Sequence, residues 1–218
     1  MSPDELAIFP LSNVVLFPGV QAPLHVFEPR YRQLTEQALA GSRLIGMVAV
    51  PPEHAAQLAG DPPVYPIGCA GSIAWSQRLP DGRYNLVLTG SHRFRIAAEA
   101  PRTAQRLYRV VEAVRLDDPF PAASRERAAE LRRRIIERLR QLGGPGSGQR
   151  ISAELFAGVD DAIFANSLCQ GLAFEPAEKQ GLLEAPDIAC RLERLDGLLA
   201  FRVAAAGGQA AAGSQRLH

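Results

Sequence analysis

The residues that could carry covalent chemistry are few in this chain of 218 residues, and Lys179 is its only lysine. A phosphate-binding P-loop needs a lysine directly after its last glycine, where the ammonium reaches the terminal phosphates of a nucleotide. Lys179 follows Glu178 instead and lies among charged residues, so we expect it on the solvated surface. A serine–lysine peptidase needs a buried lysine with a lowered pKa, and a solvated lysine does not meet that need.

The histidines and cysteines do not form a recognisable catalytic or metal-binding motif. His25, His54 and His92 are isolated, without a Gly-x-Ser-x-Gly or His-x-x-x-His motif. The cysteines lack metal-ligand spacing and are typical of buried thiols in a reducing cytoplasm; they are Cys69, Cys169 and Cys190. We therefore expect no enzyme activity, no cofactor and no metal site.

An arginine-rich segment over residues 125–140 is the one candidate for nucleic-acid binding. Glutamates are interleaved with its arginines, and Glu130 and Arg134 have the spacing of a helical ion pair. No aromatic residues alternate with the arginines to stack on bases. The pattern favours a solvated amphipathic helix, and an RNA-binding protein that uses this helix is the alternative. We do not expect nucleic acid as the principal partner.

The first half of the chain has the pattern of short strands with one helix. Apolar runs predict strands at residues 6–9, 14–17, 45–50 and 107–116, and Pro29 and Gly41 bound a helix. Residues 70–79 and 83–89 flank Pro80-Asp81-Gly82 as a hairpin, with a bulge expected at Gly90. We expect a small barrel. Its predicted core residues are Phe17, Phe27, Ile45, Val48, Leu86, Leu88 and Phe94.

After Pro119 the pattern changes to helical periodicity, with helices predicted at 124–142, 152–172, 176–184 and 187–204. The glycine-rich stretch 143–148 is typical of a connector. The sequence thus predicts an α+β protein with a β-barrel subdomain over 1–118, a helical subdomain over 119–206 and a disordered tail over 207–218. The amino terminus does not resemble a signal peptide, and no apolar run reaches the roughly 20 residues of a membrane helix, so we expect a soluble cytoplasmic protein.

Several short phrases resemble the amino-terminal substrate-binding domain of Lon-type ATP-dependent proteases. They run in the expected order from residue 5 to about residue 204: Phe9-Pro10-Leu11, Phe17-Pro18-Gly19, Phe27-Glu28-Pro29-Arg30-Tyr31, Gly68-Cys69-Ala70-Gly71, Asp81-Gly82-Arg83-Tyr84, Gly90-Ser91-His92-Arg93-Phe94, Glu178-Lys179-Gln180, Leu182-Leu183-Glu184 and Arg191-Leu192. The resemblance implies a PUA-like β-barrel with one inserted helix, followed by a helical bundle. It also implies a stand-alone recognition domain, without the ATPase and peptidase that follow it in Lon.

The resemblance and the lack of a catalytic motif together predict a non-catalytic protein-binding module. Its expected partners are unfolded or extended polypeptides, or a protease or chaperone component, and not a membrane. Exposed aromatic residues are the natural anchors for such partners. The candidates are Trp75, Phe120, Phe156 and Phe164, each of which also has the simpler interpretation of an ordinary core residue.

Overall fold

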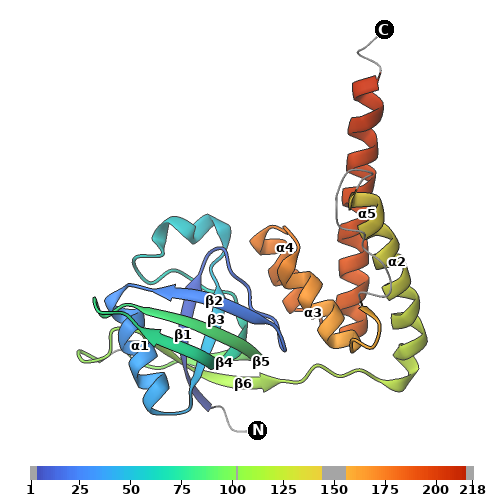
Figure 1. Ribbon diagram of the computed structural model, residues 1–218. Helices are drawn as coiled ribbons and strands as arrows, with labels where there is room; N and C mark the ends of the chain where they lie inside the picture. The colour runs from blue at the N-terminus through green and yellow to red at the C-terminus, as the bar shows by residue number, and fades with distance from the viewer. Residues whose placement is uncertain (1–3, 102, 144–155, 215–218) are drawn as a thin grey trace. The chain divides into compact units, whose positions relative to one another are not determined.

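The computed structural model describes residues 4–101, 103–143 and 156–214, and its helices and strands are drawn in Figure 1. The described residues confirm the α+β class. The strands and helices of the first part of the chain are β1 (Asp4–Leu11), β2 (Gln21–Val26), α1 (Pro29–Ala40), β3 (Leu44–Ala49), the 3-10 helix η1 (Pro52–Gln57), β4 (Ile67–Arg78), β5 (Tyr84–Glu99) and β6 (Arg109–Leu116). The later elements are η2 (Ala122–Ser124), α2 (Arg125–Gly143), α3 (Asp161–Gly171), α4 (Pro176–Leu183) and α5 (Ile188–Ser214).

The six strands are hydrogen-bonded in the order β2-β5-β4-β3-β1-β6, and β5 also pairs with β6. The 16 residues of β5 make both pairings possible, because its first part pairs with β2 and its last part with β6. The pairings therefore close a ring of β5, β4, β3, β1 and β6. Strand β2 lies outside this ring and has β5 as its one neighbour among the described strands.

Gly90 marks the bend in β5 that the sequence predicted. The pairing with β4 shifts between Ala70 and Gly71, which leaves Ser91 as the extra residue of a bulge. Gly19 N donates to Gly90 O and Gly90 N donates to Val20 O, so a loop lies directly against this bend. A Cβ atom on Gly90 would lie 2.0 Å from the carbonyl oxygen of Phe17. Only glycine fits this close backbone approach.

The interior of the ring holds the apolar core of the strands, with Ile8, Val48, Phe94 and Val111 all buried. Beside the ring, the helix α1 buries Tyr31 and Leu34. The ring of Tyr31 stacks on Phe9 of β1, with 4.0 Å between the ring centroids. Most of the predicted core residues are buried as expected, and these are Phe17, Ile45, Val48, Leu86, Leu88 and Phe94.

Two details of this half differ from the sequence-based prediction. Phe27 is 60% exposed, because it continues the outward-facing positions of β2 beyond the buried Val26. Residues 14–17 are not a strand, although Phe17 is fully buried. The backbone N–H of Phe17 donates to the side-chain oxygen of Gln170 rather than to a neighbouring strand.

The chain divides into two compact units that are not contiguous in sequence. One unit is Met1–Asp118 with Asn166–Glu184, and the other is Pro119–Ala165 with Ala185–His218. The predicted boundary at residue 118 coincides with a unit boundary. The expected single helical subdomain over 119–206 does not, because the segment 166–184 packs with the strands.

Polar side chains of the segment 166–184 attach it to the strand unit. Asn166 Nδ2 donates to Pro18 O at 2.9 Å, and Gln180 Nε2 donates to Ile67 O at 2.9 Å. Gln180 is buried, so its amide has to find a partner within the protein. The spacing of apolar residues predicts a helix but does not indicate which polar side chains form hydrogen bonds with the strands. For this reason the sequence-based prediction grouped the segment 166–184 with the other helices.

The second unit is built on α2 and α5, which pack side by side (Figure 1). Helical spacing predicts an apolar stripe on α2, and most of its members are buried: Ala128, Leu131, Ile135, Ile136 and Leu139. Leu142, the last member of that stripe, is exposed. The sequence predicts a disordered tail over 207–218, but helix α5 continues to Ser214, and residues 215–218 lie outside the described residues. Alanines on both sides of Gly207 favour the continued helix. The connector was predicted over 143–148; Gly143 is the last residue of α2, and residues 144–148 lie outside the described residues.

Candidate functional site

The outer face of β2, β5 and β4 carries a row of apolar side chains. Pro23 on β2 pairs in register with Val87 on β5, and Val87 pairs with Trp75 on β4. Val87 alternates with the buried Leu86 and Leu88, so it faces away from the core. Trp75 is 50% exposed, which is unusual for the largest apolar side chain. These residues form an apolar row across three strands.

A β-bulge explains why Trp75 faces outward. The register between β4 and β5 shifts between Ile73 and Trp75, so that Ala74 is an extra residue on β4. Ile73 is buried, and regular alternation would bury Trp75 on the same face. The bulge instead turns Trp75 to the outer face, opposite Val87.

Phe27 extends the apolar row at the end of β2. It follows Pro23 and His25 on the outward-facing positions, and its ring stacks on His25 with 6.3 Å between the centroids. The ring of His25 is fixed in turn by a hydrogen bond of 2.8 Å between its Nδ1 and Asn85 Oδ1. We call Pro23, Phe27, Trp75 and Val87 the outer apolar face. Trp75 was among the predicted site residues. Phe27, Pro23 and Val87 were missed, although the alternation along 21–27 is a signal for Pro23 and Phe27, and the alternation along 84–88 is a signal for Val87.

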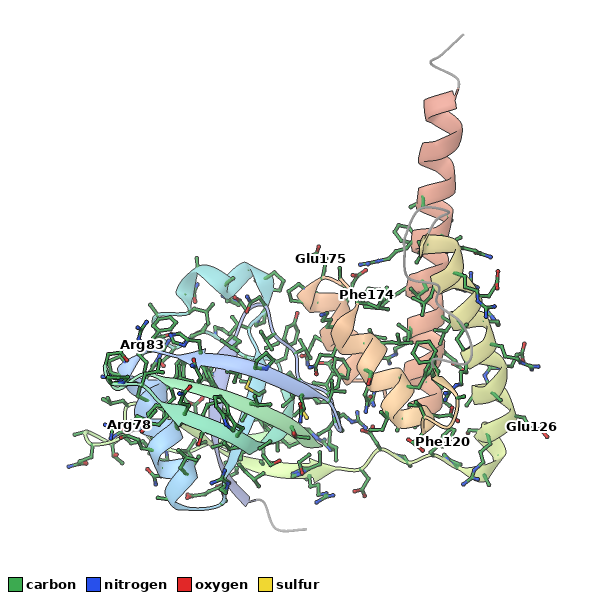
Figure 2. All side chains as sticks on the ribbon, viewed as in Figure 1. Arg78, Arg83, Phe120, Glu126, Phe174 and Glu175 are labelled. Atoms are coloured by element: carbon green, nitrogen blue, oxygen red, sulfur yellow. The ribbon has the colours of Figure 1, made fainter. Side chains whose placement is uncertain are left out.

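Arg83, which Figure 2 labels, flanks the outer apolar face at the hairpin end, with its guanidinium 3.5 Å from His25 Nε2. Arg83 forms an ion pair with Asp81 across the turn, and the hydrogen bond from its side chain holds the pKa of the Asp81 carboxyl below its ordinary value. Arg78 pairs in register with the buried Tyr84 and so lies on the opposite face of the sheet, where its guanidinium is 3.8 Å from the Glu36 carboxylate. The surroundings of the face are therefore polar, and its centre is apolar, as in many binding surfaces.

The other three predicted site residues belong to the second unit. Phe164 is 1% exposed and so cannot contact a partner in this structure. Its ring packs edge-on against Phe156, and the guanidinium of Arg132 lies 4.3 Å from its centre. Phe156 and Phe120 are half-buried, and Figure 2 labels Phe120 just before α2. The structure thus makes Phe164 a core residue.

Lys179 is also not the solvated surface residue that the sequence predicted. It is half-buried, and its ammonium donates to the carbonyl oxygen of Gln170 at 2.7 Å. Burial lowers the pKa of this ammonium below its ordinary value. Because its charge is directed at a backbone carbonyl within the unit, Lys179 fixes the end of α3 beside α4.

The arginine-rich helix α2 directs most of its charge at acidic residues of its own unit. Arg127 pairs with Glu193 and Arg132 pairs with Asp161 at 2.7 Å. Arg134 and Arg138 pair with Asp196, and Arg140 pairs with Glu137. Among the seven arginines of this helix, Arg125 and Arg133 are exposed without a carboxylate partner in the described structure. This pairing removes most of the charge that the RNA-binding alternative requires.

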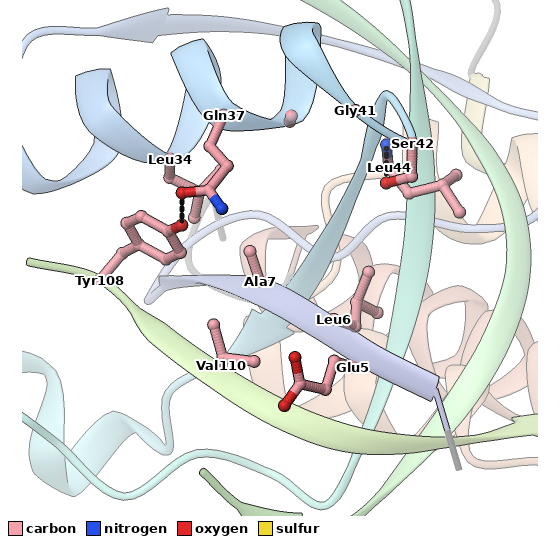
Figure 3. Close-up of a pocket in the computed structure, with 11 residues that line it drawn as sticks. Glu5, Leu6, Ala7, Leu34, Gln37, Gly41, Ser42, Leu44, Tyr108 and Val110 are labelled. Atoms are coloured by element: carbon pink, nitrogen blue, oxygen red, sulfur yellow. Dashed lines mark hydrogen bonds between the residues drawn. The ribbon is translucent and has the colours of Figure 1, made fainter. Parts of the chain in front are cut away.

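Two cavities open beside β1 in the strand unit. The first has a volume of about 210 Å³ and lies between α1 and the outward-facing residues of β1 and β6 (Figure 3). Its polar groups already bind one another, since the Tyr108 hydroxyl donates to Gln37 Oε1. The second cavity has a volume of about 410 Å³ and lies at one end of the ring of strands. It is lined by Glu5, Leu6, Ser42, Leu44, Ala70, His92, Phe94, Ala113 and Arg115, and we call it the mouth cavity.

Within the described ranges, no group of three or more histidine, cysteine, aspartate or glutamate side chains is placed to hold a metal ion. None of the helices that the structure describes is both long enough and apolar enough to span a bilayer.

The fold is similar to solved structures of Lon amino-terminal domains. The N-terminal domain of a Mycobacterium avium complex Lon protease matches with a TM-score of 0.69 and 17% identity, over 90% of this chain and 98% of that chain. The Lon N-terminal domain protein of Xanthomonas campestris matches with a TM-score of 0.59 and 23% identity, over 88% of this chain and 96% of that chain. At these identities the likeness concerns the fold.

Sequence comparison gives the family. The Lon protease of Trichlorobacter lovleyi is 29% identical over 205 residues, which cover 91% of this chain and 24% of that protein. The Lon protease of Salinispora arenicola is 33% identical over 196 residues, or 88% of this chain and 23% of that protein. The chain thus spans about a quarter of the length of these relatives. The profile of the ATP-dependent protease La (LON) substrate-binding domain matches residues 5–200, and the chain therefore belongs to this family.

Proposed function

We propose that this chain is a non-catalytic recognition module that binds exposed apolar segments of unfolded or extended polypeptides on its outer apolar face. The observation that carries the proposal is the row of Pro23, Val87 and Trp75 across three paired strands, with Trp75 half exposed. Its family membership supports a role in substrate recognition.

The geometry of the outer apolar face suits an extended peptide. Large aromatic side chains on rigid strands bury much apolar area at little cost in conformational entropy, and tryptophan is a frequent anchor of protein interfaces. Burial of apolar area contributes about 25 cal/mol per Å² removed from water. Arg83 at the hairpin end adds complementarity to acidic residues of the peptide.

Trp75 is the only tryptophan of the chain, so its fluorescence reports directly on this surface. Extended peptides of about 15 residues that are rich in leucine and phenylalanine and free of tryptophan should shift its emission to shorter wavelength as they exclude water from the indole. Peptides of the same length, with serine and glutamine in place of the apolar residues, should leave the emission unchanged.

Variants test whether the surface itself binds. The double variant Phe27→Ser with Val87→Ser keeps the reporter and should weaken the apolar peptide about tenfold or more, equivalent to about 1.4 kcal/mol. Phe201→Ser is the matched control, because Phe201 is 73% exposed but belongs to the second unit. An unchanged Trp75 emission, or an equal loss with Phe201→Ser, would argue against this surface.

The proposal includes the absence of catalysis. The purified chain should neither turn over ATP nor cleave casein, since its similarity is to the substrate-binding domain of Lon and not to the peptidase domain. Turnover that persists through stringent purification and follows the chain on a sizing column would contradict this part. The proposal also places the chain in the cytoplasm. It further includes a protease or chaperone component as a partner.

A further inference from the structure

The mouth cavity lies inside the ring of strands, at the end where the interior is not filled. Register and burial place alternate residues of each strand inward, among them Leu6, Ala70, Phe94 and Ala113. Deeper in the ring the packing is tight, since a Cβ atom on Gly46 would lie 2.9 Å from Leu6 Cδ2. The free volume of about 410 Å³ is therefore confined to the mouth.

The floor of this cavity is apolar. Ala70 and Phe94 are fully buried, and Leu6 and Ala113 are almost fully buried. The small side chains of Ala70 and Ala113, on β4 and β6, leave room that larger residues would fill. The volume lies within the usual range of small-molecule sites, which often occupy the mouths of β-barrels. Such a cavity accepts a hydrocarbon or aromatic group.

The rim of the cavity adds a cation. Arg115 lies two residues beyond Ala113 on β6 and therefore on the same inward-facing side of the strand. Its nearest carboxylate partner in the described structure is Asp117, at 4.0 Å, and both of these side chains are more than half exposed. Such a contact is weak, so the guanidinium can bind another anion. His92 lies on the same rim.

We propose that the mouth cavity binds an apolar group that carries one carboxylate. The apolar group occupies the floor formed by Leu6, Ala70, Phe94 and Ala113, and the carboxylate binds the planar guanidinium of Arg115 through paired hydrogen bonds. Two sources have this chemistry: the carboxyl-terminal residue of a polypeptide with an apolar side chain, and a free carboxylic acid of medium length. This site is separate from the outer apolar face, and either can fail without the other.

Calorimetric titration of the full chain tests the proposal with two acids and their neutral counterparts. N-acetylphenylalanine represents a carboxyl-terminal residue, and octanoate represents a free acid. N-acetylphenylalanine should bind at least about tenfold more tightly than the neutral N-acetylphenylalaninamide, and octanoate at least about tenfold more tightly than octanol. The neutral molecules cannot form the charge-assisted hydrogen bonds with Arg115. The acid that binds more tightly identifies the source, and tighter binding of either acid over its neutral partner supports the site.

Variants locate the binding. Arg115→Gln should lower the affinity for the acids about tenfold, to the level of the neutral molecules. Arg95→Gln is the matched control, because Arg95 is an exposed residue of β5 that does not line the cavity. Ala113→Leu should fill the floor and abolish binding, and thermal unfolding checks that it still folds. The Phe27→Ser and Val87→Ser double variant should bind the acids normally. Equal binding of acids and neutral molecules, or an equal loss with Arg95→Gln, overturns the proposal.

Discussion

The buried side chain of Tyr31 should lower the stability of the folded chain at alkaline pH. Its phenol is 4% exposed, and burial raises its pKa to about 12, an effect that Arg30 partly opposes. An unfolded tyrosine has a pKa of about 10. Above pH 10 the unfolded chain loses this proton, whereas the folded chain keeps it. The free energy of unfolding should therefore be unaffected by Tyr31 below pH 10 and should fall by about 3 kcal/mol as the pH rises through 12.

Urea unfolding at a series of pH values from 8 to about 12 measures this effect. Burial also raises the pKa of Tyr65, Tyr84 and Tyr108, so all of them contribute to the alkaline loss of stability. Tyr31→Phe has no ionisable phenol at this position and should show a shallower decline than the wild-type chain. Identical declines in the two proteins would show that Tyr31 ionises normally.

Gly90 should be the glycine whose replacement costs most. In Gly90→Ala the new Cβ atom would lie 2.0 Å from a backbone oxygen, which cannot move without disrupting the loop on the bulge. We expect a loss of about 3 kcal/mol or more in the free energy of unfolding. Gly197→Ala is the control: apart from its chain neighbours and the nearby backbone of α5, no atom lies within 4 Å of the added Cβ, and alanine should stabilise that helix by about 0.5–1 kcal/mol. A small effect of Gly90→Ala would mean that the bend can relax.

At the residue scale, the sequence predicted features that depend on local backbone geometry. It missed features that depend on contacts with residues distant in the chain. Gly90 was recognisable because it interrupts an alternating strand. Trp75 was a candidate anchor with an ordinary core position as its simpler interpretation; it is half exposed, and the bulge that turns it outward has no glycine or proline signal of its own. Phe164 has the same aromatic character and is buried, because Arg132 and Phe156 cover it. Aromatic type alone does not distinguish these two positions.

At the scale of elements, Asp196 joins the two long helices of the second unit. Its carboxylate is 6% exposed and accepts hydrogen bonds from Arg134 at 2.5 Å and from Arg138 at 2.7 Å. Asp196→Ala should lower the free energy of unfolding by about 2–3 kcal/mol, because it removes two charge-assisted hydrogen bonds and leaves a half-buried guanidinium unpaired. Denaturant titration followed by circular dichroism measures the change.

Glu130→Gln provides the comparison for Asp196→Ala. Glu130 is an exposed acidic residue of α2, and its replacement should change stability by less than about 0.5 kcal/mol. The loss of unfolding free energy caused by Asp196→Ala should decrease only slightly when salt is added, because salt screens partly buried ion pairs weakly. If both variants lose the same stability, the pairing of α2 with α5 does not depend on Asp196.

Element periodicity was the most reliable signal in the sequence. The hairpin around Pro80-Asp81-Gly82 and the stripe of α2 were both predicted, because alternation and helical spacing reflect the face that is buried. Residues 14–17 show the limit of this reasoning. Their apolar run indicates burial, but a side-chain amide from Gln170 takes the place of a strand partner. Periodicity thus predicted that this run is buried, but it did not predict the hydrogen-bond partner of its backbone.

At the scale of the whole molecule, the noncontiguous strand unit implies that residues 1–118 are not sufficient for folding. Buried Arg93 donates to the carbonyl oxygen of Leu183 at 3.0 Å, and the fragment 1–118 loses this partner together with the packing of Asn166–Glu184. The loss removes one charge-assisted hydrogen bond and exposes apolar surface to water, so the fragment should be unstable or partly unfolded. The fragment 1–184 retains the whole unit and should give a dispersed amide NMR spectrum and cooperative urea unfolding. A fragment 1–118 that unfolds at the same urea concentration as 1–184 would refute this noncontiguous unit.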